Sequence, residues 1–139
     1  MDNLKFKRLT LNNIDMIKEP IIIDDITYTI EMIKKFIQSE ENYIFIGTIN
    51  NKIIAFLYGY SLARPDGKNM FYIHSVDVIP GYQEKGIGTK LMDYVIDFIK
   101  SENKCYKFWV LADTDNVRAC NLYKKYGDKI EQNLFSGAL

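Results

Sequence analysis

Patterns of apolar and polar residues divide the first part of the chain into one strand and two helices. From Leu4 to Leu9 apolar and basic residues alternate, as in a half-buried strand. Asn12 can cap a short helix, which Pro20 would end. Isoleucines then recur at helical spacing between Thr29 and Gln38, so a second helix is predicted there.

Three strands are predicted in the middle of the chain. Apolar residues dominate the runs Tyr43 to Ile49 and Lys52 to Tyr60, which flank Asn50-Asn51. Because asparagine tolerates positive φ, this pair predicts a tight hairpin turn. A second turn, Arg64-Pro65-Asp66-Gly67, leads to a third antiparallel strand from Met70 to Val78.

The remaining residues alternate between helical and strand patterns. A long amphipathic helix is predicted from about Gly86 to Ser101, followed by a buried strand from Tyr106 to Leu111. A further helix would run from a cap at Asp115 or Asn116 to Gly127, and the tail from Lys129 to Phe135 could add a last strand. The order is strand, two helices, three strands, helix, strand, helix, strand. It predicts one mixed α/β (α+β) domain over residues 1–139, with a mostly antiparallel central sheet flanked by helices.

Composition narrows the classes of function. The chain has 139 residues, of which 47% are apolar, and 18 basic residues balance 18 acidic ones. Without a basic excess, no nucleic-acid partner is expected. No apolar run reaches the roughly 18 residues of a membrane span, and no signal-peptide pattern is visible, so no membrane association and a cytoplasmic location are expected. Two cysteines, one histidine and no Cys-x-x-Cys pair leave no recognisable metal site.

The segment between the third strand and the long helix has the pattern of a phosphate-binding loop. Gly86 and Gly88 lie where the helix begins, and the first amides of a helix lack internal partners and carry the positive end of its dipole. Neither the P-loop nor the Gly-x-Gly-x-x-Gly pattern occurs. A tight strand–helix connection with two packing glycines would give the same pattern.

Two motifs resemble the GNAT superfamily of acetyltransferases. Gln83-Glu84-Lys85-Gly86-Ile87-Gly88 is similar to its cofactor signature Gln/Arg-x-x-Gly-x-Gly/Ala, and Asn116 to Gly127 is similar to its second signature, Asn-x-x-Ala-x-x-Leu-Tyr-x-x-x-Gly. The resemblance covers nearly the whole chain. Within the superfamily the chain looks closest to the short, type I aminoglycoside 3-N-acetyltransferases, although Ser75 stands where those enzymes carry an acidic residue and Asp128 where the wider family has an aromatic one.

The resemblance implies a binding site for acetyl-coenzyme A that is built mostly from backbone. Pantetheine would lie along Val76 to Val78 like an added strand. The side chain of Asn116 would hold a pantetheine amide. The pyrophosphate would sit on the loop and helix start formed by Gln83, Glu84, Lys85, Gly86, Ile87, Gly88 and Thr89.

The expected reaction is direct acetyl transfer to the primary amine of a small molecule, with both substrates bound together. Tyr123, at the family's tyrosine position, is the predicted acid for the departing thiolate, and the alternative is a packing tyrosine. The backbone N–H near Val78 would stabilise the oxyanion. His74 and Asp77 compete for the role of base. Strict alternation would put them on opposite faces, and only a bulge would bring them together.

The acceptor is expected to bind against the first two helices, with Asp24, Asp25 and Tyr28, and against the turn from Ala63 to Asn69. Acidic residues there would suit a polyamine or an aminosugar, and they would equally suit a solvated loop. Two other functions fit the same motifs: an acyl-coenzyme A sensor without turnover, and an enzyme that acetylates a protein N-terminus or lysine. A second subunit could complete the sheet edge, which would make the protein a homodimer.

Overall fold

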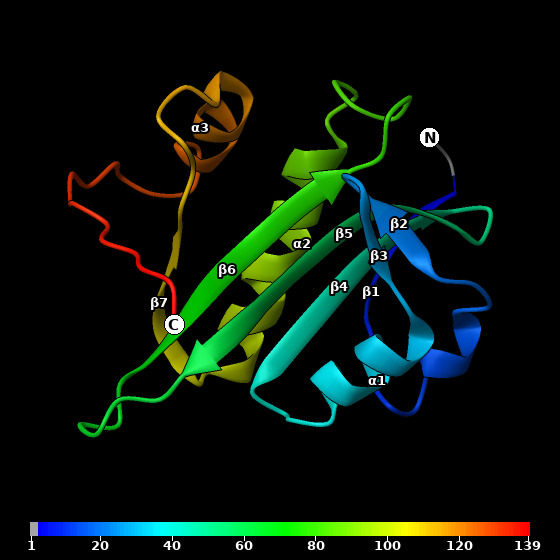
Figure 1. Ribbon diagram of the computed structural model, residues 1–139, viewed down its shortest axis with the longest axis horizontal. Helices are drawn as coiled ribbons and strands as arrows, with labels where there is room; N and C mark the ends of the chain where they lie inside the picture. Colours follow the sequence, from blue (N-terminus) through cyan, green and yellow to red (C-terminus); the bar gives the residue numbers. More distant parts are fainter. Residues whose placement is uncertain (1–2) are drawn as a thin grey trace.

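A computed structural model describes residues 3–139 of the chain. Its central sheet has five strands in the order β1-β4-β5-β6-β7, and a separate two-stranded sheet pairs β2 with β3 (Figure 1). The elements in chain order are β1 (Leu4–Arg8), the 3₁₀ turn η1 (Ile14–Met16), β2 (Ile21–Ile23), β3 (Ile26–Tyr28), α1 (Ile30–Ile37), β4 (Asn42–Ile49), β5 (Lys52–Leu62), β6 (Asn69–Val78), α2 (Ile87–Glu102), β7 (Cys105–Val110) and α3 (Val117–Tyr123).

The mixed α/β class and the mostly antiparallel sheet are confirmed. Strands β1, β4, β5 and β6 pair antiparallel, and α2 carries the chain back so that β7 pairs parallel to β6. The predicted turn between β4 and β5 is present, with Asn50 and Asn51 at φ 49° and 67°. The predicted cap of α1 is also present, because the Thr29 hydroxyl accepts a hydrogen bond from the Met32 amide at 3.1 Å.

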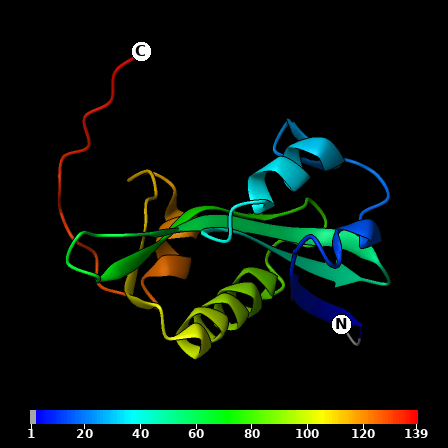
Figure 2. The ribbon, with the colours of Figure 1, turned by 90° about the horizontal axis from the view of Figure 1, so that it is seen from below.

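Two apolar layers hold the fold together, one on each face of the sheet, with α1 and α2 on opposite sides (Figure 2). On the α2 side, Leu91, Met92 and Val95 are completely buried against Phe45 and Phe71. These helical residues recur at three- and four-residue spacing, which puts them on one stripe of α2. Burying each such side chain stabilises the fold by about 1.5–3 kcal/mol relative to exposure.

Between β1 and α1 the predicted helix is replaced by other structure. Only the single 3₁₀ turn η1 forms near Asn12, and the chain then makes the hairpin β2–β3. Asp24 and Asp25 form its turn with φ of 56° and 62°. The hairpin escapes a search for alternation because β2 is a continuous run of isoleucines, of which Ile21 and Ile23 are buried.

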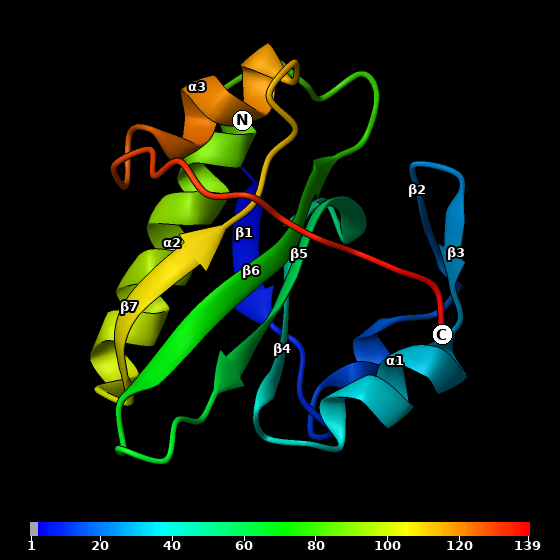
Figure 3. The same ribbon diagram turned by 60° about the vertical axis from the view of Figure 1, so that its left-hand side comes forward.

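The predicted C-terminal strand from Lys129 to Phe135 is wrong. Residues 128–139 contain neither helix nor strand (Figure 3), and α3 ends at Tyr123 with turns from there to Gly127. Ile130 and Phe135 are 73% and 88% exposed, so no sheet face buries the apolar positions of the tail. Strand β7 therefore has one strand neighbour, β6, among the described residues. Completion of this edge by a second subunit stays a prediction.

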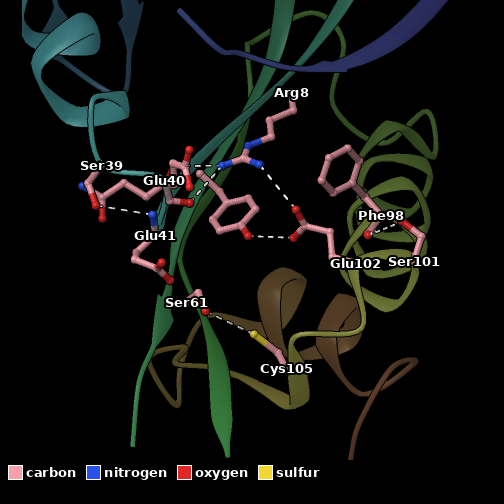
Figure 4. Close-up of polar contacts among 11 residues, drawn as sticks. Arg8, Ser39, Glu40, Glu41, Ser61, Phe98, Ser101, Glu102 and Cys105 are labelled. Atoms are coloured by element: carbon pink, nitrogen blue, oxygen red, sulfur yellow. Dashed lines mark hydrogen bonds and ion pairs between the residues drawn. The ribbon is translucent and has the colours of Figure 1, made fainter. Parts of the chain in front are cut away.

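Arg8 links the C-terminal end of α2 to the sheet (Figure 4). The guanidinium of Arg8 lies 3.7 Å from the centroid of the Tyr43 ring, and one of its nitrogens is 3.6 Å from a carboxylate oxygen of Glu102. The Tyr43 hydroxyl donates to the same carboxylate at 2.6 Å. Burial and this hydrogen bond raise the pKa of Tyr43. The network fixes α2 at its C-terminal end and leaves its N-terminal end to the candidate site.

Candidate active site

The loop between β6 and α2 presents an open helix start. Gly86 is the N-cap of α2 and has a left-handed backbone with φ of 78°. A Cβ atom added at Gly86 would meet nothing within 4 Å, so the space over the helix start is free. The left-handed conformation is costly for residues with a Cβ, which explains the glycine at this position. The loop residues before it, Gln83, Glu84 and Lys85, are exposed.

The second glycine of the motif has a different surrounding. A Cβ atom at Gly88 would lie 3.5 Å from the Cδ2 atom of Leu122, so Gly88 faces α3. The packing interpretation therefore applies to Gly88. Ile87 is 1% exposed, and its side chain belongs to the core, so only its backbone remains for a ligand. Of the two glycines, Gly86 is the one that borders open space.

Cationic side chains from the α3 region border this loop, and the sequence analysis missed them. Arg118 donates to Gln83 Oε1 at 2.8 Å and to Glu84 Oε1 at 2.9 Å. Lys125 Nζ donates to Thr89 Oγ1 at 3.1 Å, next to the helix start. Both cations lie inside the second motif, where the separation of more than thirty residues from the loop hides their contact. Because Arg118 is ion-paired with Glu84, Lys125 and the exposed Lys85 supply the excess positive charge beside the helix start, which suits an anion.

Tyr126 fastens the turn after α3 to α2. Its hydroxyl lies 2.9 Å from the carbonyl oxygen of Thr89 and 2.7 Å from Asp93 Oδ1, and both oxygens accept. Burial and the hydrogen bond to Asp93 raise the pKa of Tyr126. Asn116 caps the other end of α3, because its Oδ1 accepts from the Ala119 amide at 3.1 Å. The predicted contact of Asn116 with pantetheine stays a prediction, to which its Nδ2 atom could contribute.

The last residues of β6 form an open strand edge. Pairing of β6 with β7 ends at Ile73 and Val110, and the two strands then diverge (Figure 1). On the other side of β6, the Ile79 amide donates to the Ile54 carbonyl at 3.0 Å. Because hydrogen-bonded and non-bonded pairs alternate in an antiparallel ladder, the backbone groups of Val76 and Val78 point away from β5 and toward the gap. This is the edge along which an extended ligand was predicted to add.

A bulge in β6 brings His74 and Asp77 to one face of the sheet. Tyr58 pairs with Ser75 but the next residue, Gly59, pairs with Ile73, so His74 is the additional residue. A bulge was the condition under which His74 and Asp77 would share one face, and this bulge is present. Gly59 is needed beside the bulge, because a Cβ atom there would lie 2.3 Å from the Tyr72 carbonyl oxygen. Tyr58 lies near both groups: its ring centroid is 4.9 Å from that of His74, and it pairs with Ser75, whose hydroxyl donates to Asp77.

Asp77 is a half-buried carboxyl group without a cation beside it. Burial raises its pKa first, and the charge of Asp24 raises it further. The Ser75 hydroxyl donates to Asp77 Oδ2 at 2.6 Å and acts in the opposite direction. Among residues 3–139 no lysine or arginine forms an ion pair with Asp77. His74 is exposed by contrast, with its Nδ1 atom 3.2 Å from the Tyr60 hydroxyl.

Tyr123 is the last residue of α3 and is half-buried against the α2-side core. Burial, then the charge of Asp77, raises the pKa of Tyr123 to about 12. The phenol therefore keeps its proton at neutral pH. Asp77 pairs with Phe56, whose ring centroid lies 4.9 Å from that of Tyr28, so the carboxylate lies on the hairpin side of the sheet.

The predicted acceptor wall is present only in part. After burial, the charge of Asp24 contributes to the raised pKa of Asp77. The charge of Asp77 in turn contributes, again after burial, to the raised pKa of Tyr28. The turn from Ala63 to Asn69 precedes β6, whereas Val78 ends it, so the turn lies about 30 Å from the predicted thioester position and cannot form part of that wall. A cavity of about 250 Å³ opens on the α1 face instead. Its lining residues are Tyr28, Met32, Ile33, Phe36, Ile44, Phe56, Tyr58 and Tyr60.

Other features of the described chain bear less directly on the site. A larger cavity of about 410 Å³, with Arg8 and Lys104 in its wall, contains none of the predicted site residues. Within residues 3–139 no three His, Cys, Asp or Glu side chains are grouped as they would be around a metal ion. No helix in that range is both long and apolar enough to cross a membrane.

Comparison with known proteins places the fold. Residues 11–128 match the model of the Acetyltransferase (GNAT) family. The spermidine N(1)-acetyltransferase of Escherichia coli strain K12 is 30% identical over 57 residues, which are 41% of this chain and 31% of that enzyme. The match thus spans about a third of the length of this curated relative.

Several solved structures have a fold that is similar to this one over nearly the whole chain. An aminoglycoside acetyltransferase from an uncultured soil metagenomic sample, in complex with sisomicin, has a TM-score of 0.76 at 23% identity, covering 99% of this chain and 96% of that one. A second such enzyme, HMB0005, has a TM-score of 0.80 at 19% identity, with 98% of each chain covered. AAC(6')-Iy, in complex with the bisubstrate analogue CoA-S-monomethyl-acetylneamine, has a TM-score of 0.73 at 12% identity, with 98% of both chains covered. At these identities the likeness shows a common fold.

Proposed function

The chain belongs to the acetyltransferase (GNAT) family, and from that premise we propose that it transfers the acetyl group of acetyl-coenzyme A to the primary amine of a small molecule. One observation carries the proposal. The open edge of β6 at Val76 and Val78 is followed by the loop that leads to the open helix start at Gly86. Asp77 lies within the same stretch of β6, and after burial its charge is the next cause that raises the pKa of Tyr123. An extended thiol ester with a pyrophosphate at its far end fits this sequence of features.

The loop and the edge would hold coenzyme A as the two motifs imply. Amides from Gln83 to Thr89 would bind the pyrophosphate, with Lys85, Arg118 and Lys125 nearby as counter-charges. The outward backbone groups of Val76 and Val78 would pair with the pantetheine amides. The Gln83 side chain already donates to the Val78 carbonyl at 2.9 Å, which shows that this oxygen faces the gap.

The chemical step is direct. The neutral amine nitrogen attacks the thioester carbonyl, so that a C–N bond forms and the C–S bond breaks. The amide N–H of Val78 faces the gap and would stabilise the oxyanion, because a preorganised donor needs no reorganisation. The departing thiolate takes the proton of Tyr123, whose pKa of about 12 keeps the phenol protonated until then. The phenolate recovers a proton from solvent.

We assign the proton acceptor to Asp77 in preference to His74. Asp77 is close enough to Tyr123 for its charge to act on that phenol, and it precedes Val78 directly. His74 lies four residues before Val78, which is about 13 Å along an extended strand. Its ring packs among tyrosines instead, with centroids 4.9 Å from Tyr58 and 5.4 Å from Tyr72. Asp77 would take the proton that the amine loses, directly or through one water.

The test is thiol release from acetyl-coenzyme A in the presence of small primary amines, with mass spectrometry of the product. Amine-dependent thiol release and one added acetyl group per product are expected. If coenzyme A binds but no amine releases thiol, the protein is a sensor. If only peptides are acetylated, the protein-directed alternative is correct.

A further inference from the structure

We propose that the acceptor is a monoamine with an aromatic or similarly flat apolar body. The inference rests on the proposed function and names the substrate class of the same site. The body would lie on a surface that we call the aromatic face, on the α1 side of the sheet. The aromatic face consists of Tyr28, Phe36, Phe56, Tyr58, Tyr60, Tyr72, His74 and Trp109.

The rings of the aromatic face are in continuous contact across four strands, β3, β5, β6 and β7. The Tyr28 centroid lies 4.9 Å from Phe56, and Tyr58 lies 6.3 Å from Tyr60. Tyr60 in turn lies 6.1 Å from Tyr72, which stacks on Trp109 at 4.3 Å. These spacings are those of interacting aromatic pairs. Tyr58, Tyr60 and Tyr72 are only half-buried, so their ring surfaces remain partly available to a ligand.

The cavity on the aromatic face has the lining of an apolar binding site. Five of the residues around its 250 Å³ are aromatic, and Met32, Ile33 and Ile44 complete it. Among the described residues, 3–139, no carboxylate, lysine or arginine lines it. Ligand sites of this kind bind apolar bodies and use a few polar groups for orientation. The hydroxyl groups of Tyr28, Tyr58 and Tyr60 are the polar groups available here.

Asp77 lies at the border of this cavity, because it pairs across the sheet with Phe56, one of the lining residues, and cross-strand partners share a face. The charges of Asp77 and Asp24 both act on Tyr28, another lining residue. A half-buried carboxylate without a cationic partner is unfavourable unless a ligand supplies the cation. An ammonium group on the acceptor is such a cation. The acceptor would bind with this ammonium group at Asp77 and its apolar body in the cavity. The ammonium group would lose one proton to solvent before the attack, so that the neutral nitrogen faces the Val78 edge and Asp77 is free to take the second proton.

A polycationic acceptor fits this arrangement less well. A second or third ammonium group would have to lie among apolar and aromatic side chains, where the lining offers no carboxylate. Within residues 3–139, Asp24 is the further acid whose charge acts on Asp77. The charge count therefore favours one amine over several.

The experiment compares 2-phenylethylamine, spermidine and sisomicin as acceptors for the whole chain. We expect kcat/KM for 2-phenylethylamine to exceed the other two at least tenfold. Phe36→Ala removes a ring 5.8 Å from Tyr58 and should raise the KM for 2-phenylethylamine about tenfold while leaving the KM for acetyl-coenzyme A unchanged. Lys35→Ala, an exposed neighbour on α1, is the control and should change neither constant.

A binding measurement separates this inference from the proposed function. Trp109 is the chain's one tryptophan and stacks on Tyr72, so its emission reports on the aromatic face. With coenzyme A present, 2-phenylethylamine should change that emission in a saturable way, and spermidine should not. Faster acetylation of spermidine or sisomicin, or a Phe36→Ala variant that behaves like Lys35→Ala, would overturn the inference and leave the acetyltransferase proposal intact. Thiol release with none of the amines, despite saturable binding of 2-phenylethylamine, would instead overturn the acetyltransferase proposal.

Discussion

Tyr123 and Asp77 share one electrostatic environment, although forty-five residues separate them in the sequence. The negative charge of Asp77 and the burial of the phenol both raise the pKa of Tyr123. A higher pKa makes the phenol a weaker acid toward most bases, but a thiolate that leaves a thioester is itself strongly basic once desolvated. Tyr123 is therefore protonated before the reaction begins, and the Asp77 carboxylate is available to bind a cation.

Replacing Tyr123 by phenylalanine tests the acid at the scale of one atom. The ring and its packing stay, so folding and affinity for acetyl-coenzyme A should be retained. Turnover should fall by about 10²–10⁴-fold, the usual contribution of a general acid. Steady-state kinetics measures the loss, and isothermal titration with coenzyme A provides the control. Turnover equal to the wild type would mean that Tyr123 serves packing alone.

Asp77→Asn should separate activity from stability. Activity should fall by about 10²–10⁴-fold, because the amide cannot accept the amine's proton. Stability should change in the other direction. Burial raises the folded-state pKa of Asp77 above its unfolded value, so the stability it contributes is present below the unfolded pKa and is lost as pH rises through the folded pKa.

At neutral pH the asparagine variant should therefore melt at a higher temperature than the wild type, and the difference should vanish in acid. Thermal unfolding between pH 3 and pH 8 measures it. His74→Ala serves as the comparison for activity and should keep the shape of the wild-type pH–rate profile. If His74→Ala loses the acid limb of that profile while Asp77→Asn keeps its turnover, the base is His74.

At the scale of elements, the loop between β6 and α2 is the predicted binding site for the pyrophosphate of coenzyme A. A matched pair of glycines in the chain allows this prediction to be tested. Gly86 and Gly67 have φ of 78° and 80°, and a Cβ atom at either would meet nothing within 4 Å. Valine at each position should cost a similar backbone strain, of about 1–2 kcal/mol. Only the side chain at position 86 would occupy the space over the helix start.

The wild type and Gly67→Val should both be stabilised by coenzyme A, by about 2.7 kcal/mol at a hundredfold excess over Kd. Gly86→Val should lose most of that stabilisation. Differential scanning fluorimetry with and without coenzyme A measures all three proteins. Equal thermal shifts in the two valine variants would show that Gly86 serves only the turn geometry. Gly88 is unsuitable for this test, since a Cβ atom there would contact Leu122 Cδ2 at 3.5 Å and so would not extend into open space.

The elements that local patterns specify were predicted well, and those that depend on distant contacts were not. The Thr29 cap and the Asn50-Asn51 turn are local signals, and both are present. The β6 bulge depends on Gly59 in the neighbouring strand, which no periodicity within β6 indicates. Contacts of Arg118 and Lys125 with the loop likewise require the tertiary fold. The predicted tail strand had a suitable pattern but no sheet edge to bury it.

Across the whole molecule, stability is concentrated in the sheet and α2. Phe45, Leu57 and Phe71 are completely buried in the middle of the sheet, whereas α3 has no buried residue. Arg118 and Glu84, which join α3 to the loop, form an exposed ion pair of the kind that contributes 0–1 kcal/mol. The α3 segment should therefore open locally at a much lower free energy than the sheet.

Bound coenzyme A should raise the free energy of opening of the α3 segment toward that of the sheet, because it would lie between β6 and α3 and contact both. Hydrogen exchange followed by mass spectrometry is expected to show fast exchange at residues 117–127 in the free protein and clear protection there with coenzyme A bound. Peptides from β4 and β5 should exchange slowly in both states. Gly86→Val is the control and should leave residues 117–127 unprotected at the same coenzyme A concentration. Protection of β1 and β4 in place of α3 would put the ligand at the opposite end of the sheet and contradict the site.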